Sequence, residues 1–187
     1  MFSLSLAEFP VSSIYKLNPR IRTMDQQRAH YRELFHFDLW SNRQLIKLFE
    51  REQEFEHRVA CMAFVSHILT VQQIWFHKLI GDAMAAELDP WAEYSIDELK
   101  SKAKNLHALW LDVIEDEDSS LDMECFMTKP DGSSMQMPLW RILQHLIVHG
   151  QHHRAQVSQF LIKSGMLHSI MDRPLPSDSQ MTISWNS

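Results

Sequence analysis

The segment LWRILQHLIVHGQHHRAQVSQFLIKSG, residues 139–165, has the pattern of a long amphipathic helix. Its apolar side chains recur at three- and four-residue steps, which is the period of one helix face. Pro138 suits the start of the helix, because proline has a helical φ and no N–H that needs a partner. Gly165 suits its end, because glycine readily adopts the left-handed conformation that closes a helix. We therefore predict a helix that opens after Pro138 and ends near Lys163.

Four histidines lie close together on this predicted helix: His145, His149, His152 and His153. At 100° per residue, they occupy an arc of roughly 100°. His149 and His153 are four residues apart, so their rings lie side by side one turn apart, as in zinc-binding helices. Both belong to the inward stripe, which contains Ile142, Leu146, His149, His153, Val157 and Phe160. An imidazole buried in an apolar interior is costly unless it finds a polar partner.

Three further segments show helical periodicity. They span about Met24–Arg51, about Arg58–Ile80, and a third that begins at the capping-box pattern Ser95–Glu98 and ends near the acidic run Glu115–Asp118. Four amphipathic helices must bury their stripes against each other, so we predict an all-α protein with a four-helix bundle.

Between the third and fourth helices, Cys125–Met137 contains the hairpin turn signal Asp131-Gly132, which predicts a short two-stranded β-ribbon.

The second predicted helix places a histidine among apolar residues. Its stripe contains Ala60, Phe64, His67, Val71 and Ile74. One divalent cation bound to His67, His149 and His153 would satisfy all three rings at once, since it accepts one lone pair from each.

The alternative interpretation is that each histidine is an ordinary core or surface residue. We retain it for the isolated histidines His36, His57, His77 and His107. Likewise, four tryptophans are predicted to be core residues rather than a substrate platform: Trp40, Trp75, Trp110 and Trp140.

Composition excludes several classes of function. The chain has 187 residues and a net charge of −6 with scattered basic residues, which argues against nucleic-acid binding. With only 4 glycines it has no phosphate-binding loop motif. We find no apolar run of the roughly 18 residues that a membrane span needs, nor a signal-peptide pattern, so we expect a cytoplasmic protein.

The two cysteines, Cys61 and Cys125, form no metal-binding or disulfide pattern and are expected to be reduced thiols. His57 lies one helical turn before Cys61, which leaves an activated thiol as an alternative that no other feature of that segment supports.

We expect residues 24–187 to form a single domain with an irregular tail after Arg173, preceded by an extension of residues 1–23.

Three motifs together resemble the DinB/YfiT-like superfamily. They are His145-x-x-x-His149-x-x-x-His153-Arg154-x-Gln156, the Trp-x-Asn within Phe35–Asn42, and Ser66-His67-Ile68, and the resemblance covers about residues 24–170. It implies a four-helix bundle with crossover connections, often a homodimer. It also implies a divalent metal held by His67, His149 and His153, in families that include thiol-dependent S-transferases and proposed metal-dependent hydrolases.

Three histidine ligands leave a coordination position open, which is typical of catalytic metal sites. The first hypothesis is therefore a metalloenzyme that activates a low-molecular-weight thiol for transfer, or water for hydrolysis, on a small electrophilic substrate. Zn²⁺ or Ni²⁺ suits imidazole best, with Fe and Mn as alternatives. His145 is a candidate hydrogen-bond partner or proton shuttle, while His152 is a more distant candidate for a neighbouring role.

The second hypothesis is a non-catalytic, stress-associated or interaction protein with a structural or vestigial metal. A pocket beside the histidines, lined by first-helix residues such as Trp40, would favour catalysis. Relatives commonly have an acidic residue one to two turns after the second-helix histidine, where this chain has Gln72 and Gln73. A general base would therefore have to come from another group.

Overall fold

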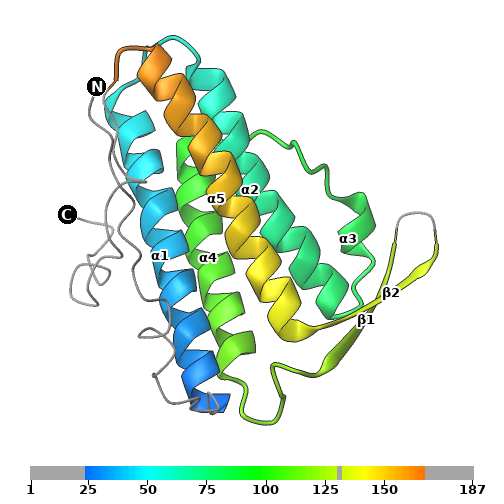
Figure 1. Cartoon of the computed structure of the whole chain (residues 1–187). Helices are drawn as coiled ribbons and strands as arrows, with labels where there is room; N and C mark the ends of the chain where they lie inside the picture. Colours follow the sequence, from blue (N-terminus) through cyan, green and yellow to red (C-terminus); the bar gives the residue numbers. More distant parts are fainter. Residues whose placement is uncertain (1–23, 130–131, 167–187) are drawn as a thin grey trace, which may run out of the picture.

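The computed structural model describes residues 24–129 and 132–166, which form four long helices, one short helix and a two-stranded ribbon (Figure 1). In chain order the elements are α1 (Met24–Arg51), α2 (Arg58–Leu79), α3 (Met84–Glu87), α4 (Ile96–Glu115), β1 (Glu124–Thr128), β2 (Ser134–Pro138) and α5 (Leu139–Lys163). The prediction of an all-α protein is confirmed. The predicted extension of residues 1–23 and the tail after Arg173 lie outside the described residues.

The helices form a bundle in which successive helices are not all neighbours. In Figure 1, α1 and α5 run in one direction and α2 and α4 in the other. The segment that leads from α2 through α3 to α4 therefore returns along the length of the bundle as a crossover connection. Within the bundle, α1 packs mainly against α4, and α2 packs mainly against α5. The two helices that carry the predicted ligands are thus direct neighbours.

Two apolar clusters fill the interior. The cluster near the C-terminal ends of α1 and α5 includes Phe49, Cys61 and Leu161, and the cluster near their N-terminal ends includes Trp110, Ile142 and Leu146. All six side chains are almost fully inaccessible to solvent. Burial of this apolar surface is the main term that stabilises the bundle.

The N-terminus of α4 is capped by side chains of its own first turn. Ser95 accepts a hydrogen bond from the backbone N–H of Glu98, and the Glu98 carboxylate accepts one from the backbone N–H of Ser95 at 2.8 Å. This reciprocal pair satisfies two N–H groups that a helix N-terminus would otherwise leave free, and it confirms the predicted capping box.

The ribbon pairs β1 with β2 in antiparallel register, from Glu124 opposite Pro138 to Thr128 opposite Ser134. Burial alternates along β1, so one face of the ribbon packs on the bundle. Gly132 has a φ of 80°, which only glycine adopts readily, as expected of a turn residue.

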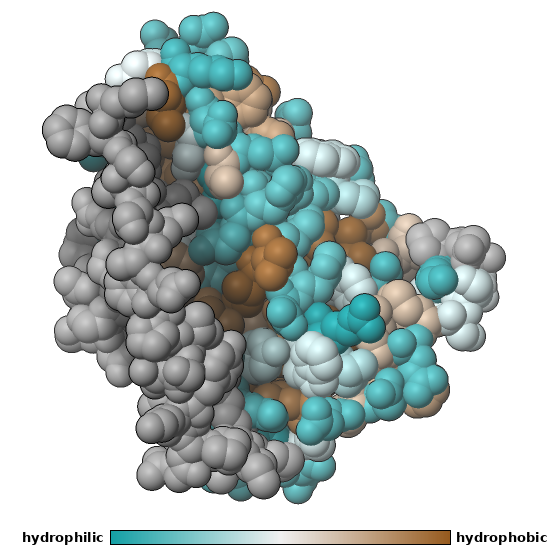
Figure 2. Space-filling view, viewed as in Figure 1, coloured by the Kyte–Doolittle hydropathy of each residue, from teal (hydrophilic) through white to brown (hydrophobic). Residues whose placement is uncertain are grey.

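Among the described residues, α2 is the one helix whose length and mean hydropathy would suffice to cross a bilayer. The sequence was expected to contain no apolar run of this length, because polar residues such as His67 and Gln72 interrupt α2. Nine of its residues, both of these among them, are buried in the bundle, which accounts for its apolar composition. On the face seen in Figure 2, hydrophobic residues form separate groups among hydrophilic ones.

Candidate metal centre

Three histidines meet where α2 and α5 pack together. His67 lies near the middle of α2, and His149 and His153 lie one turn apart on α5. One ring nitrogen of each lies within 4.8 Å of the others, and the Nε2 atoms of His149 and His153 are 3.2 Å apart. The structure thus brings together the three residues predicted from the sequence, in a group that could hold a metal ion.

Hydrogen bonds fix the orientation of two of these rings. Nδ1 of His67 lies 2.8 Å from the carbonyl oxygen of Pro90, and Nδ1 of His153 lies 2.6 Å from Oε1 of Gln156. Because both oxygens act as acceptors, each Nδ1 carries the proton and donates it. Each Nε2 therefore keeps its lone pair for another partner. Metal-bound histidines almost always show this arrangement.

The local electrostatics also favour neutral rings. Burial, followed by the neighbouring histidines, lowers the pKa of His149 to about 3. Burial lowers the pKa of His153 as well, although its bond to Gln156 acts in the opposite direction. Since a metal binds imidazole only in its neutral form, a divalent cation that prefers nitrogen ligands fits this donor set.

Aromatic side chains surround the histidines. The ring of Trp91 stacks on that of His67, with centroids 3.9 Å apart and an angle of 11°, and the ring of Phe64 stacks on that of His153 at 5.4 Å. Trp91 is 51% exposed and lies in the crossover segment beside Pro90. Neither Pro90 nor Trp91 was predicted from the sequence, because an irregular segment has no periodicity that would show which helix it contacts.

The two remaining histidines of α5 lie outside the group of three. The ring of His145 is 5.7 Å from that of His149 and 5.1 Å from that of Trp75. The ring of His152 lies 5.0 Å from that of His153. Both residues are exposed. Their predicted neighbouring roles stay predictions.

The histidines treated as isolated turn out to have partners. Nδ1 of His36 lies 2.9 Å from Nε2 of His107, between α1 and α4. Nδ1 of His77 lies 2.9 Å from Oδ2 of Asp82. None of these histidines belongs to the candidate metal centre.

A nucleophilic role for Cys61 has no structural support. The residue is completely buried, and burial raises the pKa of its thiol to about 11. The reactive thiolate is therefore suppressed near neutral pH.

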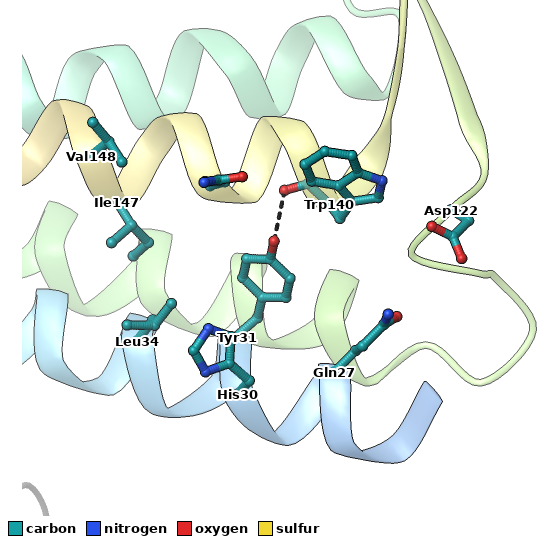
Figure 3. A pocket seen from close by; sticks show the side chains of 9 residues that line it. Gln27, His30, Tyr31, Leu34, Asp122, Trp140, Ile147 and Val148 are labelled. Carbon is teal, nitrogen blue, oxygen red and sulfur yellow. Dashed lines mark hydrogen bonds between the residues drawn. The ribbon is translucent and has the colours of Figure 1, made fainter. Parts of the chain in front are cut away.

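A pocket beside the histidines that was lined by Trp40 would have favoured catalysis, but Trp40 lines neither of the two cavities described here. Trp40 is buried in an apolar cluster and stacks on Phe37. A cavity of about 570 Å³ does lie between α1 and α5, as Figure 3 shows, where Tyr31 donates a hydrogen bond to the carbonyl of Trp140. The residues of α5 that line this cavity lie on the side of α5 opposite to His149. The prediction that Trp40 is a core residue is therefore confirmed, whereas Trp140, which is 36% exposed and lines this cavity, is not the core residue that was predicted.

A second cavity, of about 770 Å³, borders the metal centre more closely. Pro90, whose carbonyl holds His67, is part of its wall, together with Ile74 and Lys78. At 100° per residue, Ile74 and Lys78 lie on the same face of α2 as His67.

The model of the DinB family matches residues 26–185 of this chain. No curated protein and no solved structure matches it.

Proposed function

The chain belongs to the DinB family, and from this premise we propose that it is a metalloenzyme whose divalent ion is held by His67, His149 and His153. The observation that carries the proposal is the convergence of three imidazole nitrogens, from two neighbouring helices, within 4.8 Å of one another. Two of the rings already donate their Nδ1 protons to fixed oxygens, so each Nε2 carries the lone pair that a metal would bind.

We propose that the reaction is the activation of a low-molecular-weight thiol for transfer, or of water for hydrolysis. A divalent ion with three protein ligands supplies a Lewis acid that lowers the pKa of such a nucleophile. Within the described residues, no carboxylate belongs to the group of three histidines. Zn or Ni is the favoured ion, with Fe or Mn as alternatives, because imidazole suits all four.

The surrounding residues have separate roles in this proposal. Pro90 and Gln156 hold the rings of His67 and His153 in a single orientation. Phe64 and Trp91 exclude water from one side of the site. His145, one turn before His149, would accept and release a proton at a ring nitrogen, because it is exposed and its ring lies 5.7 Å from that of His149.

The proposal extends to the setting of the reaction. The substrate would be a small thiol or electrophile. The protein would be a cytoplasmic homodimer, and it would bind neither nucleic acid nor a membrane. The net charge of −6 supports the exclusion of nucleic acid, since phosphates repel an acidic surface. The resemblance to a family in which homodimers are common supports the oligomeric state.

Elemental analysis of the purified full-length chain tests the proposal. We expect one divalent ion per wild-type chain and none in His149→Ala. His152→Ala is the matched control, because it removes an exposed histidine of the same helix and should leave the metal in place. An equal metal content in wild type and His149→Ala would overturn the ligand assignment.

A screen of thiols against electrophilic acceptors then tests catalysis. We expect turnover by the wild type and none by His149→Ala. Stoichiometric metal without turnover of any thiol or hydrolytic substrate would favour the non-catalytic alternative.

A further inference from the structure

Four polar side chains from three helices form a buried cluster inside the bundle. Asp38 and Asn42 come from α1, Gln72 from α2 and Arg154 from α5, and each of them is less than 5% exposed. Nη1 of Arg154 donates to Oδ1 of Asp38 at 2.6 Å and to Oδ1 of Asn42 at 2.9 Å. The cluster therefore balances one buried positive charge with one buried negative charge.

The Asp38 carboxylate connects the two helices that carry the histidines. Its Oδ1 accepts from Arg154 on α5, and its Oδ2 accepts from Nε2 of Gln72 on α2 at 2.8 Å. Asn42 donates to the same Oδ2 at 3.1 Å and so fixes the carboxylate from its own helix. Helix α1 supplies no candidate ligand, yet one of its side chains holds both ligand-bearing helices.

The contacts on α5 are made next to the ligands. Arg154 directly follows His153, and Gly150 directly follows His149. A Cβ atom at Gly150 would lie 2.9 Å from Oδ1 of Asp38 and 3.1 Å from both terminal nitrogens of Arg154. Any larger residue here would force the ion pair to shift, so glycine is used although inside a helix it costs about 1 kcal/mol relative to alanine.

We propose that Asp38 is a positioning residue of the metal centre. Through its hydrogen bonds to Arg154 and Gln72, Asp38 sets the rotation of α5 about its axis and its position along α2, so that His149 and His153 face His67. A buried ion pair adds little net stability compared with apolar packing, but the loss of one partner leaves an unpaired charge. The pair therefore favours one packing arrangement of the helices over others. This inference rests on the proposed function, because it takes the three histidines as the metal site.

Titration of the metal-free full-length chain with Co²⁺, followed by visible absorption, tests the inference. Asp38→Asn should weaken Co²⁺ binding about tenfold and alter the absorption bands, because the amide presents an N–H toward one of its former donors. Gln72→Met keeps the Asp38–Arg154 pair and removes only the connection to α2. It should weaken binding by a smaller factor even if Asp38→Asn fails to fold.

Arg28→Gln is the matched control. Arg28 is also buried on α1, but its guanidinium donates to the carbonyls of Ile114, in the last turn of α4, and of Ser119, in the loop beyond it, and neither residue belongs to a ligand-bearing helix. The Arg28→Gln variant should have a lower melting temperature but a Co²⁺ affinity within about twofold of wild type, since a purely structural defect does not move the ligands.

The outcomes separate the two proposals. If Gln72→Met and any folded Asp38→Asn bind Co²⁺ as tightly as wild type, or if Arg28→Gln weakens binding as much as they do, the positioning role is overturned and the metal centre stands. A wild-type chain that binds no Co²⁺ overturns the metal centre, and the positioning role with it.

Discussion

Two of the three candidate ligands, His67 and His153, have a hydrogen-bond acceptor at Nδ1, the ring nitrogen away from the site. His153 donates Nδ1–H to Gln156, which lies one turn further along α5. Such partners fix the tautomer and the ring orientation, and their loss typically lowers metal affinity 10–100-fold. The same helix that supplies the ligand thus also supplies the residue that orients it.

We predict that Gln156→Leu weakens metal binding at least about tenfold while the chain stays folded, because the ring of His153 becomes free to rotate. Isothermal titration with Zn²⁺ measures the affinity. Gln159→Leu is the control, since this glutamine is exposed on the same helix and should leave the affinity unchanged. Equal affinities for Gln156→Leu and wild type would contradict the orienting role.

The pair of His36 and His107 predicts a dependence of stability on pH. Burial, and then the neighbouring His36, lower the pKa of His107 to about 4, while an ordinary histidine titrates near 6.5. Between these values the unfolded chain binds a proton that the folded chain does not. Stability from this group is therefore complete above about pH 6.5 and declines as the pH falls toward about 4, by at most about 1.4 kcal/mol per unit.

Urea unfolding at pH 7 and at pH 5 measures this dependence. Wild type should lose more of its free energy of unfolding between the two pH values than His107→Gln, which cannot take up the proton. Histidines that do not contact His107 contribute equally to both proteins and cancel in the comparison. An identical loss in both would show that His107 is not the group responsible.

At the scale of the elements, the crossover segment matters as much as the long helices. It brings Pro90 and Trp91 against His67, and the capping box at Ser95 then begins α4. The position of this segment is thus fixed at its far end by the start of a helix.

We predict that Ser95→Ala lowers the free energy of unfolding by about 1 kcal/mol, because it removes the side-chain acceptor from the first turn of α4. Ser101→Ala is the matched control: Ser101 is exposed inside α4, where alanine is the better helix former, so its stability should be equal or slightly higher. Chemical denaturation at pH 7 measures both. If the two variants have equal stability, the cap does not stabilise the helix.

At the scale of the whole molecule, the metal centre would connect two helices that are far apart in the sequence, α2 and α5. His67 belongs to α2, which leads into the crossover, and His149 and His153 belong to α5, which follows the ribbon. A ligand that binds only the folded state stabilises it by about 2.7 kcal/mol at a hundredfold excess over its Kd. Metal bound at this contact should therefore increase the stability of the whole fold.

We predict that removal of the metal by a chelator lowers the melting temperature by several degrees and that added Zn²⁺ restores it. Differential scanning calorimetry measures the change, and elemental analysis verifies removal. His149→Ala should show no response to either treatment, because one of the three ligands is absent. A wild-type melting temperature that does not change after verified removal would contradict a metal bound in the folded core.

The sequence revealed the features that depend on local patterns within a single helix. The 3.6-residue period identified the long helices and placed His67, His149 and His153 on buried faces, and the Ser95–Glu98 pattern located the start of α4. These signals are local, because a helix positions side chains three and four residues apart without reference to the rest of the chain.

Apart from the predicted convergence of His67 with His149 and His153, contacts between distant segments emerged only in the folded bundle. Arg154 meets Asp38 across 116 positions and Pro90 meets His67 across 23, and neither pairing leaves a periodic trace in the sequence. Periodicity determines that a side chain points inward, but the packing of one helix against another determines what it meets there.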